Sequence, residues 1–216
     1  MKVGTDGTLL GAWAKGGSRI LDIGTGTGVV ALMMAQRFPE AHVTAIDCDE
    51  PACRQASSNV AASPFARRIS IYHTSLQNFI NHPPSPVTPY HAIVCNPPFF
   101  ENALLCPSGQ RTTARHAITL SYRDLFQGVA RMLAVEGEFS AIIPFDCRSR
   151  FEEEAIIAGL FPSRVCAVHT TERKPARRYL LAFRRQPVPA VENVRLVVGG
   201  AMYQSLLQDF LLRKVE

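Results

Sequence analysis

The stretch that decides the fold reads SRILDIGTGTG at residues 18–28, and an apolar helical pattern follows at once over residues 28–37. A short apolar strand that runs into alternating glycines and then into a helix is the context of a nucleotide-binding turn. Glycine lets the backbone turn sharply and approach a ligand, because no Cβ stands in the way. The stretch therefore predicts an α/β protein that binds a nucleotide-like ligand at this loop.

The acid that precedes the loop limits the classes of ligand that the loop can bind. A dinucleotide-binding turn has the spacing GxGxxG and holds a diphosphate, whereas here Asp22 precedes Gly24, Gly26 and Gly28 at alternate positions. A carboxylate there would repel a diphosphate and attract an ammonium group. Asp47, which ends the next apolar run, can accept hydrogen bonds from two ribose hydroxyls of either NAD or S-adenosylmethionine. The loop resembles that of class I S-adenosylmethionine-dependent methyltransferases, and a nicotinamide-dependent oxidoreductase is the alternative.

Short apolar runs alternate with longer helical patterns along most of the chain, which favours a parallel sheet covered by helices. Only about eight residues separate the last two strands, too few for a crossover helix, so these strands should form an antiparallel hairpin. We expect a Rossmann-like class I methyltransferase fold in one domain over residues 1–216, with a seven-stranded, mostly parallel sheet, a C-terminal antiparallel hairpin and helices on both faces. A strand-like run at 194–198 and a short helix should pack onto the sheet edge. The expected strands are 18–23, 42–47, 69–73, 90–95, 138–143, 164–170 and 178–184, and the expected helices are 28–37, 50–61, 122–133 and 151–160.

Composition excludes several classes of protein. The chain has 216 residues, of which 47% are hydrophobic, yet no apolar run approaches the roughly 20 residues of a membrane span, and no signal peptide follows Met1. We therefore expect a cytoplasmic protein with no membrane contact. The six cysteines form no CxxC pair and the histidines show no ligand spacing, so neither a disulfide framework nor a metal site is indicated.

Positive charge is concentrated near the C-terminus. The formal net charge is +5, but residues 164–185 hold seven basic residues against one acid, which leaves −1 for the rest of the chain. A basic patch on the predicted hairpin suits phosphate, although a solvated hairpin kept for solubility is an equal alternative. The basic residues are Arg164, Arg173, Lys174, Arg177, Arg178, Arg184 and Arg185.

A second motif follows the strand expected at residues 90–95, which delivers Asn96-Pro97-Pro98-Phe99 to the sheet edge where doubly wound folds bind ligands. Proline stiffens this segment, so that the Asn96 side-chain oxygen and the Pro97 carbonyl can accept both hydrogens of one planar amino group. Holding both hydrogens frees the nitrogen lone pair for attack, so that positioning replaces a strong base. Phe99 would stack on the flat substrate. The alternative is that the prolines merely end the strand.

This tetrapeptide and the glycine loop resemble those of the amino-group methyltransferases that act on adenine N6, guanine N2 or glutamine N5. KVGTDG at residues 2–7 and RTTAR at residues 111–115 make the whole chain similar to the bacterial tRNA1(Val) adenine-37 N6-methyltransferase family. Proteins of that family carry a further segment ahead of this lysine, so Met1 could mark a truncation. The resemblance implies that Asn96, Pro97, Pro98 and Phe99 hold the target base and that S-adenosylmethionine is bound by Thr5, Asp6, Asp22, Gly24, Thr25, Gly26, Gly28, Asp47, Cys48, Ser75, Leu76 and Asn96.

One position departs from the family pattern. The family has an acid after the third strand that accepts from the cofactor adenine, whereas this chain has Thr74-Ser75-Leu76. Serine can still accept a hydrogen bond, but the contact is neutral and therefore weaker. We expect cofactor affinity, and not cofactor identity, to be affected.

The same resemblance implies a tRNA substrate and no metal, and a monomer is slightly favoured. Cations would meet RNA phosphates after the tetrapeptide and on the hairpin. The rival functions are a ribosomal RNA guanine-N2 methyltransferase, a release-factor glutamine-N5 methyltransferase, and a cofactor-binding RNA adaptor without turnover. The expected RNA-binding residues are Arg111, Arg115, Arg173, Lys174, Arg177 and Arg178.

Overall fold

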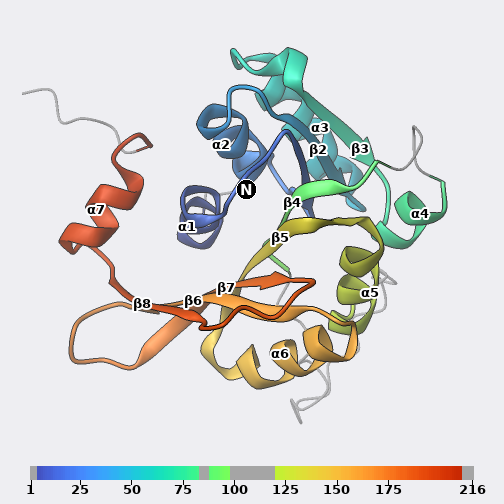
Figure 1. The fold of residues 1–216 in the computed structure, drawn as a ribbon. Helices are drawn as coiled ribbons and strands as arrows, with labels where there is room; N and C mark the ends of the chain where they lie inside the picture. Colours follow the sequence, from blue (N-terminus) through green and yellow to red (C-terminus); the bar gives the residue numbers. More distant parts are fainter. Residues whose placement is uncertain (1–3, 83–87, 98–119, 211–216) are drawn as a thin grey trace, which may run out of the picture.

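The computed structural model describes residues 4–82, 88–97 and 120–210, which form one eight-stranded sheet in the order β3-β2-β1-β4-β5-β7-β6-β8 (Figure 1). Strand β7 runs antiparallel to both β5 and β6, and every other neighbouring pair is parallel. The strands are β1 (Arg19–Ile23), β2 (His42–Asp47), β3 (Ile69–His73), β4 (Tyr90–Cys95), β5 (Leu133–Pro144), β6 (Phe161–His169), β7 (Ala176–Arg184) and β8 (Glu192–Val197).

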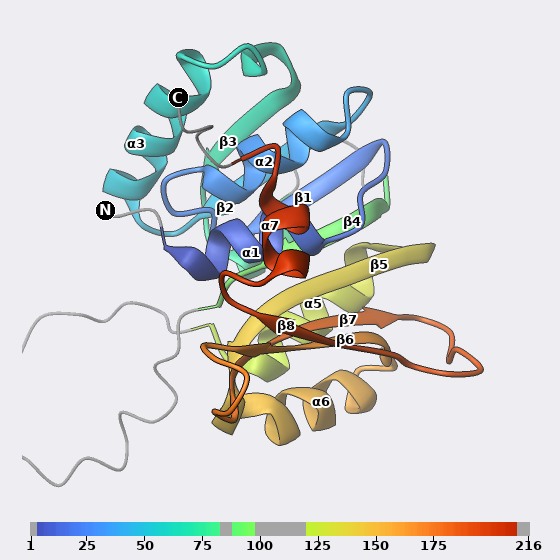
Figure 2. The same cartoon turned by 90° about the vertical axis from the view of Figure 1, so that its left-hand side faces the viewer.

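Helices cover both faces of the sheet (Figures 1 and 2). Side chains of α1, α2, α3 and α7 belong to the hydrophobic core on one face, and those of α4, α5 and α6 belong to the core on the other. None of the helices in the described part of the chain is long and apolar enough to span a membrane. The helices are α1 (Thr5–Trp13), α2 (Val29–Arg37), α3 (Glu50–Ala61), α4 (Leu76–Asn81), α5 (Tyr122–Met132), α6 (Arg148–Ile157) and α7 (Ala201–Leu207).

The expected Rossmann-like fold with a C-terminal hairpin is confirmed, but the strand count of seven is wrong. The tail run forms an eighth strand, β8, which pairs in parallel with β6 in register from Arg164↔Glu192 to His169↔Val197. Only Leu196 of β8 is fully buried, so the strand lacks the apolar alternation by which sequence patterns reveal a paired strand. The strand is held by its backbone pairing with β6 on one side.

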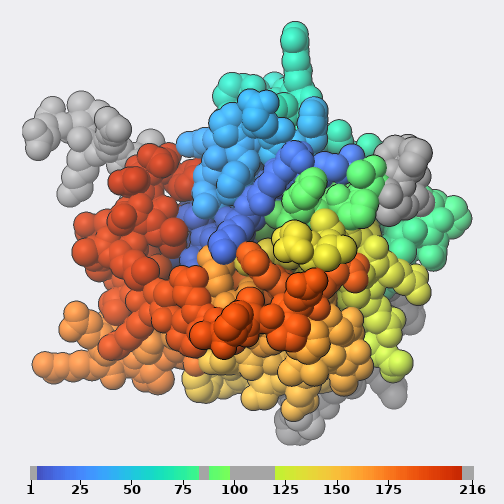
Figure 3. Space-filling model, viewed as in Figure 1, coloured from blue at the N-terminus to red at the C-terminus, as the bar shows by residue number. Residues whose placement is uncertain are grey.

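Two helices, α1 and α4, were not expected from the sequence. Helix α1 buries Leu9, Leu10, Gly11 and Ala12 in succession and has no side-chain cap, so it shows neither amphipathic periodicity nor a start signal. Helix α4 spans only six residues, which is too short for a periodic pattern. In the space-filling view the first elements of the chain, in blue, lie above the orange surface of the last strands (Figure 3).

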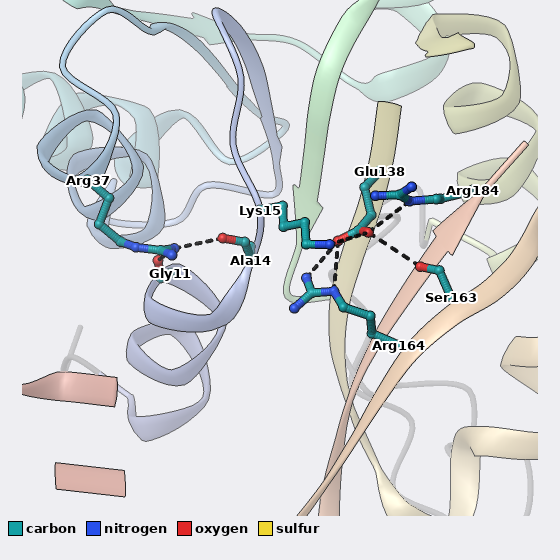
Figure 4. Close-up of polar contacts among 8 residues, drawn as sticks. All are labelled: Gly11, Ala14, Lys15, Arg37, Glu138, Ser163, Arg164 and Arg184. Carbon is teal, nitrogen blue, oxygen red and sulfur yellow. Dashed lines mark hydrogen bonds and ion pairs between the residues drawn. The ribbon is translucent and has the colours of Figure 1, made fainter. Parts of the chain in front are cut away.

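A buried carboxylate ties β5 to the hairpin (Figure 4). Glu138 of β5 is 3% exposed, and its Oε1 accepts hydrogen bonds from Arg164 Nε at 3.1 Å and from the same guanidinium at 2.6 Å. Its Oε2 accepts from Arg184 Nε at 3.1 Å and lies 3.8 Å from Lys15 Nζ. Arg164 also lies over the Trp13 ring, 3.9 Å from the centroid. Two members of the basic run are therefore used inside the fold and not at a surface.

Candidate active site

The glycine loop connects β1 to α2 and is built from left-handed backbone. Gly24, Gly26 and Gly28 have φ angles of 71°, 57° and 82°, which other residues rarely adopt. A Cβ at Gly24 or Gly26 would meet nothing within 4 Å, whereas a Cβ at Gly28 would lie 3.3 Å from the Ala56 Cβ of α3. The first two glycines thus leave open space at the loop, and the third allows α2 and α3 to pack closely.

The loop is fixed from two sides by hydrogen bonds. The amides of Gly24 and Thr25 donate to the Ile46 carbonyl at 2.9 and 3.0 Å. Behind the loop, Asn59 Nδ2 of α3 donates to the Thr27 carbonyl at 2.9 Å. Sequence reasoning missed Asn59, because a lone half-buried asparagine on a helix carries no distinguishing pattern. The loop is therefore held in its ligand-ready shape by β2 and α3.

Asp22 lies beneath the loop and is only 1% exposed. Its Oδ2 accepts a hydrogen bond from Thr25 Oγ1 at 2.6 Å. Burial raises the pKa of the Asp22 carboxyl from 3.8 to about 7, against the hydrogen bonds from Thr25 and the Ala31 amide that lower it. This carboxyl organises the loop, and its charge near neutral pH depends on what binds above it.

Asp47 ends β2 and touches the same loop. Its Oδ2 accepts from the Gly26 amide at 2.8 Å, and its Oδ1 accepts from the Asp49 amide at 2.9 Å. Cys48 beside it is exposed, and its carbonyl lies 3.1 Å from His73 Nε2. A carboxylate held at both oxygens by backbone amides has a fixed orientation toward any hydroxyl that approaches the sheet edge.

Ser75 and Leu76 follow β3 at that edge. Ser75 caps α4, and its Oγ accepts from the Asn78 amide at 3.1 Å, while Leu76 is buried. One lone pair of the hydroxyl is thus already used within the chain. The structure gives a physical reason why serine here would accept more weakly than an acid would.

Asn96 and Pro97 follow β4 next to the glycine loop. The register Ile23↔Cys95 places the next residues of the two strands, Gly24 and Asn96, beside each other at the carboxyl edge. Asn96 Oδ1 is inaccessible to solvent and has no hydrogen-bond partner among the described residues. A buried acceptor without a donor is costly in a native protein, so this oxygen can accept a hydrogen bond from a ligand. Arg19 Nε and Ser140 Oγ are the other buried side-chain atoms without a partner among the described residues. The expected site residues Pro98, Phe99, Arg111 and Arg115 lie outside the described residues.

Two expected site residues pair with each other across the fold. Thr5 and Asp6 lie in the first turn of α1, and Asp6 Oδ2 accepts from Arg178 Nε of β7 at 2.9 Å. The Asp6 and Arg178 side chains are 24% and 34% exposed. The residue expected at the cofactor and the residue expected at RNA therefore meet at one place on the carboxyl edge.

The tip of the β6–β7 hairpin presents three exposed cations, Arg173, Lys174 and Arg177. The Lys174 carbonyl lies 2.8 Å from His169 Nδ1, and Arg195 of β8 donates to the Glu172 carbonyl. Because β6 runs parallel to β5 and β4, this tip lies at the same edge of the sheet as Asn96. The other members of the basic run are engaged internally: Arg164 and Arg184 by Glu138, Arg185 by carbonyls of Ala130 and Leu133, and Arg178 by Asp6.

These residues fit S-adenosylmethionine. The glycine loop leaves open space, and Asp22 and Asp47 provide acidic groups for an ammonium and for ribose hydroxyls. Asn96, with its unpartnered oxygen, follows β4 beside Gly24. The described residues contain no group of three or more His, Cys, Asp or Glu side chains that could hold a metal ion. The candidate site is a group of backbone, carboxylate and amide groups at the carboxyl edge of the sheet.

Comparison with solved structures agrees with this architecture. A protein described as a predicted O-methyltransferase from Agrobacterium tumefaciens matches with a TM-score of 0.71 and 17% identity, over 98% of this chain and 100% of that chain. TrmN from Thermus thermophilus matches with a TM-score of 0.60 and 22% identity, over 83% of this chain and 47% of that chain. At these identities the likeness establishes the class I methyltransferase fold.

Sequence comparison finds relatives of higher identity. The family profile described as Methyltransferase small domain matches residues 7–142. A protein of Parabacteroides distasonis named tRNA1(Val) (adenine(37)-N6)-methyltransferase is 42% identical over 99% of this chain and 92% of its own length. Proteins of the same name from Bacteroides fragilis and Vibrio parahaemolyticus are 45% and 41% identical, over 85% and 99% of this chain and 77% and 90% of their own lengths. With its glycine loop, its sheet edge and these relatives, the chain belongs to the methyltransferase small domain family and, within it, to the tRNA1(Val) (adenine(37)-N6)-methyltransferase family of S-adenosylmethionine-dependent enzymes.

Proposed function

We propose that this chain transfers the methyl group of S-adenosylmethionine to N6 of an adenine in tRNA, namely adenine 37 in the anticodon loop of tRNA1(Val). The observation that carries the proposal is the buried, unpartnered Asn96 Oδ1 beside Gly24 of the cofactor loop. Such an acceptor can hold an amino hydrogen, whereas a hydroxyl or thiol nucleophile would also need a base to take its proton.

The chain's residues act by holding the nucleophile. When bound, S-adenosylmethionine supplies a methyl group on an electrophilic sulfonium. Asn96 Oδ1 accepts one hydrogen of the adenine amino group, and the Pro97 carbonyl accepts the other, which draws the nitrogen toward a tetrahedral shape and exposes its lone pair. Because the prolines stiffen this segment, the alignment exists before the substrate arrives. Asp22 and Asp47 meanwhile orient the cofactor through its ammonium and ribose groups.

Docking of the RNA is assigned to the tip of the β6–β7 hairpin. Arg173, Lys174 and Arg177 are exposed at the edge that holds Asn96, so their contacts with anticodon-stem phosphates would leave the loop bases free to reach the site. Phosphate contacts of this kind make affinity fall with salt concentration. We propose a monomer acting in the cytoplasm, where its tRNA substrate is found.

The test offers labelled S-adenosylmethionine with purified tRNA, ribosomal RNA or release factor, followed by nucleoside digestion of the product. N6-methyladenosine from tRNA supports the proposal. N2-methylguanosine, or label in the release factor alone, overturns it in favour of a guanine or glutamine methyltransferase.

A companion variant tests the role of Asn96. Asn96→Ala should lower kcat by a factor of about 10² to 10³, because one preorganised polar contact to the reacting group is lost. Because Asn96 is also expected at the cofactor, kcat is measured at saturating S-adenosylmethionine, and calorimetry with S-adenosylhomocysteine reports any loss of cofactor affinity separately. An Asn96→Ala enzyme with wild-type kcat would show that the orphaned oxygen does not hold the nucleophile.

A further inference from the structure

An exposed aromatic stack lies where β5 ends. Phe145 follows Pro144 at the start of a short 3-10 helix (Phe145–Cys147) and is 47% exposed. Its ring stacks on that of Tyr179 of β7, with centroids 5.8 Å apart and planes at 26°. The Arg148 guanidinium lies 4.6 Å from the Tyr179 centroid and pairs with Glu152 at 2.9 Å. Phe145, Tyr179 and Arg148 are called the aromatic stack below.

Phe145 is unusual because phenylalanine seldom lies at a surface. Within the described part of the chain it is the one phenylalanine, tyrosine or tryptophan in the exposed class. The other large exposed apolar side chains in that part are aliphatic and include Ile156 and Ile157 of α6. The exposed face of the Phe145 ring is therefore open to contact with a ligand.

The position of the stack relates it to the reacting centre. Tyr179 pairs with Ile143 of β5, and Cys95 of β4 pairs with Ala141 of β5, so β4, β5 and β7 are successive strands at one edge. With neighbouring strands about 4.8 Å apart, the backbone of β7 at Tyr179 lies two strand spacings, roughly 10 Å, from that of β4 at its end. Arg177, two residues before Tyr179, is exposed at the same edge. A flat ring face with a cation nearby lies within one nucleotide's reach of the target site.

The chemistry of such a surface matches an unstacked nucleobase. Bases of RNA loops are recognised by stacking on aromatic side chains and guanidinium planes. Every base offers a flat π face, whereas an aliphatic side chain of a protein partner would gain little from a stacked pair of rings backed by arginine. The positive charge of the nearby hairpin tip complements the phosphates that accompany the base.

We propose that Phe145, supported by Tyr179 and Arg148, is a stacking site for an unpaired nucleobase of the RNA next to the adenine to be methylated. This inference rests on the proposed function, because it concerns the same substrate. It assigns to the end of β5 the task of holding the neighbouring nucleotide while the target base is turned toward Asn96.

The experiment measures steady-state methylation of tRNA by Phe145→Ala, Phe145→Leu and Phe145→Trp. KM for tRNA should rise about tenfold when the ring is lost to alanine or leucine and should return to near wild type with tryptophan. The kcat value and the affinity for S-adenosylhomocysteine should not change. Ile156→Ala, which removes an apolar side chain of similar exposure from α6 (53%, against 47% for Phe145), is the matched control and should leave KM unchanged.

A second arm uses an anticodon stem-loop RNA with an abasic residue on one side or the other of the target adenine. If Phe145 stacks on that neighbour, the KM of the wild-type enzyme should rise about tenfold on one of the two abasic RNAs. The KM of Phe145→Ala should be no higher on that abasic RNA than on the intact RNA. The inference is overturned if Phe145→Leu keeps the wild-type KM, or if the Phe145→Ala and abasic effects add in full. A wild-type chain that methylates no RNA would instead refute the proposed function. Thermal unfolding of each variant separates loss of fold from loss of binding, and the leucine and tryptophan variants carry the test if alanine unfolds.

Discussion

Burial of Asp22 under the glycine loop makes the stability of the fold depend on pH. Burial raises the pKa of this carboxyl from 3.8 to about 7. Near pH 5 the folded chain keeps the proton while the unfolded chain releases it, so the unfolded state binds fewer protons and stability falls as pH rises. The loss begins near pH 4 and is complete above about pH 7, where both states are ionised. At about 1.4 kcal/mol per pH unit, the free energy of unfolding should fall by about 4 kcal/mol over this range.

Asp22→Asn isolates this effect, because asparagine keeps an acceptor for Thr25 but does not titrate. Urea unfolding of both proteins between about pH 4.5 and pH 8.5 gives the difference in unfolding free energy, from which the titration of all other groups cancels. That difference should move in favour of the variant by about 3 to 4 kcal/mol as pH rises. Thr25→Val removes a hydrogen bond that lowers the pKa and should move the midpoint to higher pH. A difference that is flat within about 1 kcal/mol would refute the reasoning that burial keeps the acid neutral.

Three further outcomes are expected. Binding of S-adenosylhomocysteine below about pH 7 should release a proton, because an ammonium group favours the ionised form of Asp22, and calorimetry in two buffers of different ionisation enthalpy would detect it. Glu138→Gln should lower the free energy of unfolding by about 3 kcal/mol, measured in urea, because Arg164 is 10% exposed and loses its counter-charge. Asp6→Asn should cost less than about 1 kcal/mol of stability, since the Asp6 and Arg178 side chains are 24% and 34% exposed and water screens the pair. Filter binding should nevertheless show tighter tRNA binding, because an anion is removed from the carboxyl edge where the RNA is proposed to dock.

Much of the fold follows from local patterns. The expected strand at 18–23 is β1 (Arg19–Ile23), and the next three strands were predicted with the observed bounds. Continuous apolar runs between turn residues identify buried parallel strands, because both faces of such strands are covered. The cofactor loop could be predicted equally well, because glycines at alternate positions and a carboxylate at fixed spacing before them are local properties of the chain.

Which basic residues of the run are exposed could not be predicted from the sequence, because a sum of charges along the chain treats every cation as solvated. Arg164 and Arg184 face a buried glutamate that precedes them by 26 and 46 positions, and Arg178 pairs with Asp6, which lies 172 positions away. Such pairings depend on the strand order β5-β7-β6, which no local pattern encodes. Of the seven cations in the run, those at the hairpin tip are the ones left facing outward at the carboxyl edge.

In the proposed mechanism Asn96 takes the place of a base, and the strand register supports this role. The backbone pairing of β1 and β4 ends at Ile23↔Cys95, so the next residues, Gly24 and Asn96, are held side by side by the sheet itself. The loop that follows Gly24 is in turn held by the carbonyl of Ile46, the carboxylate of Asp47 and the amide of Asn59. An amino nitrogen conjugated to a ring is unprotonated near neutral pH, so no base has to remove a proton before attack, and its delocalised lone pair needs direction. After the methyl group is transferred from the sulfonium, the nitrogen is acidic and releases its extra proton to water. A register fixed by strand hydrogen bonds provides that direction, whereas a titrating side chain would add a pH dependence that the reaction does not require.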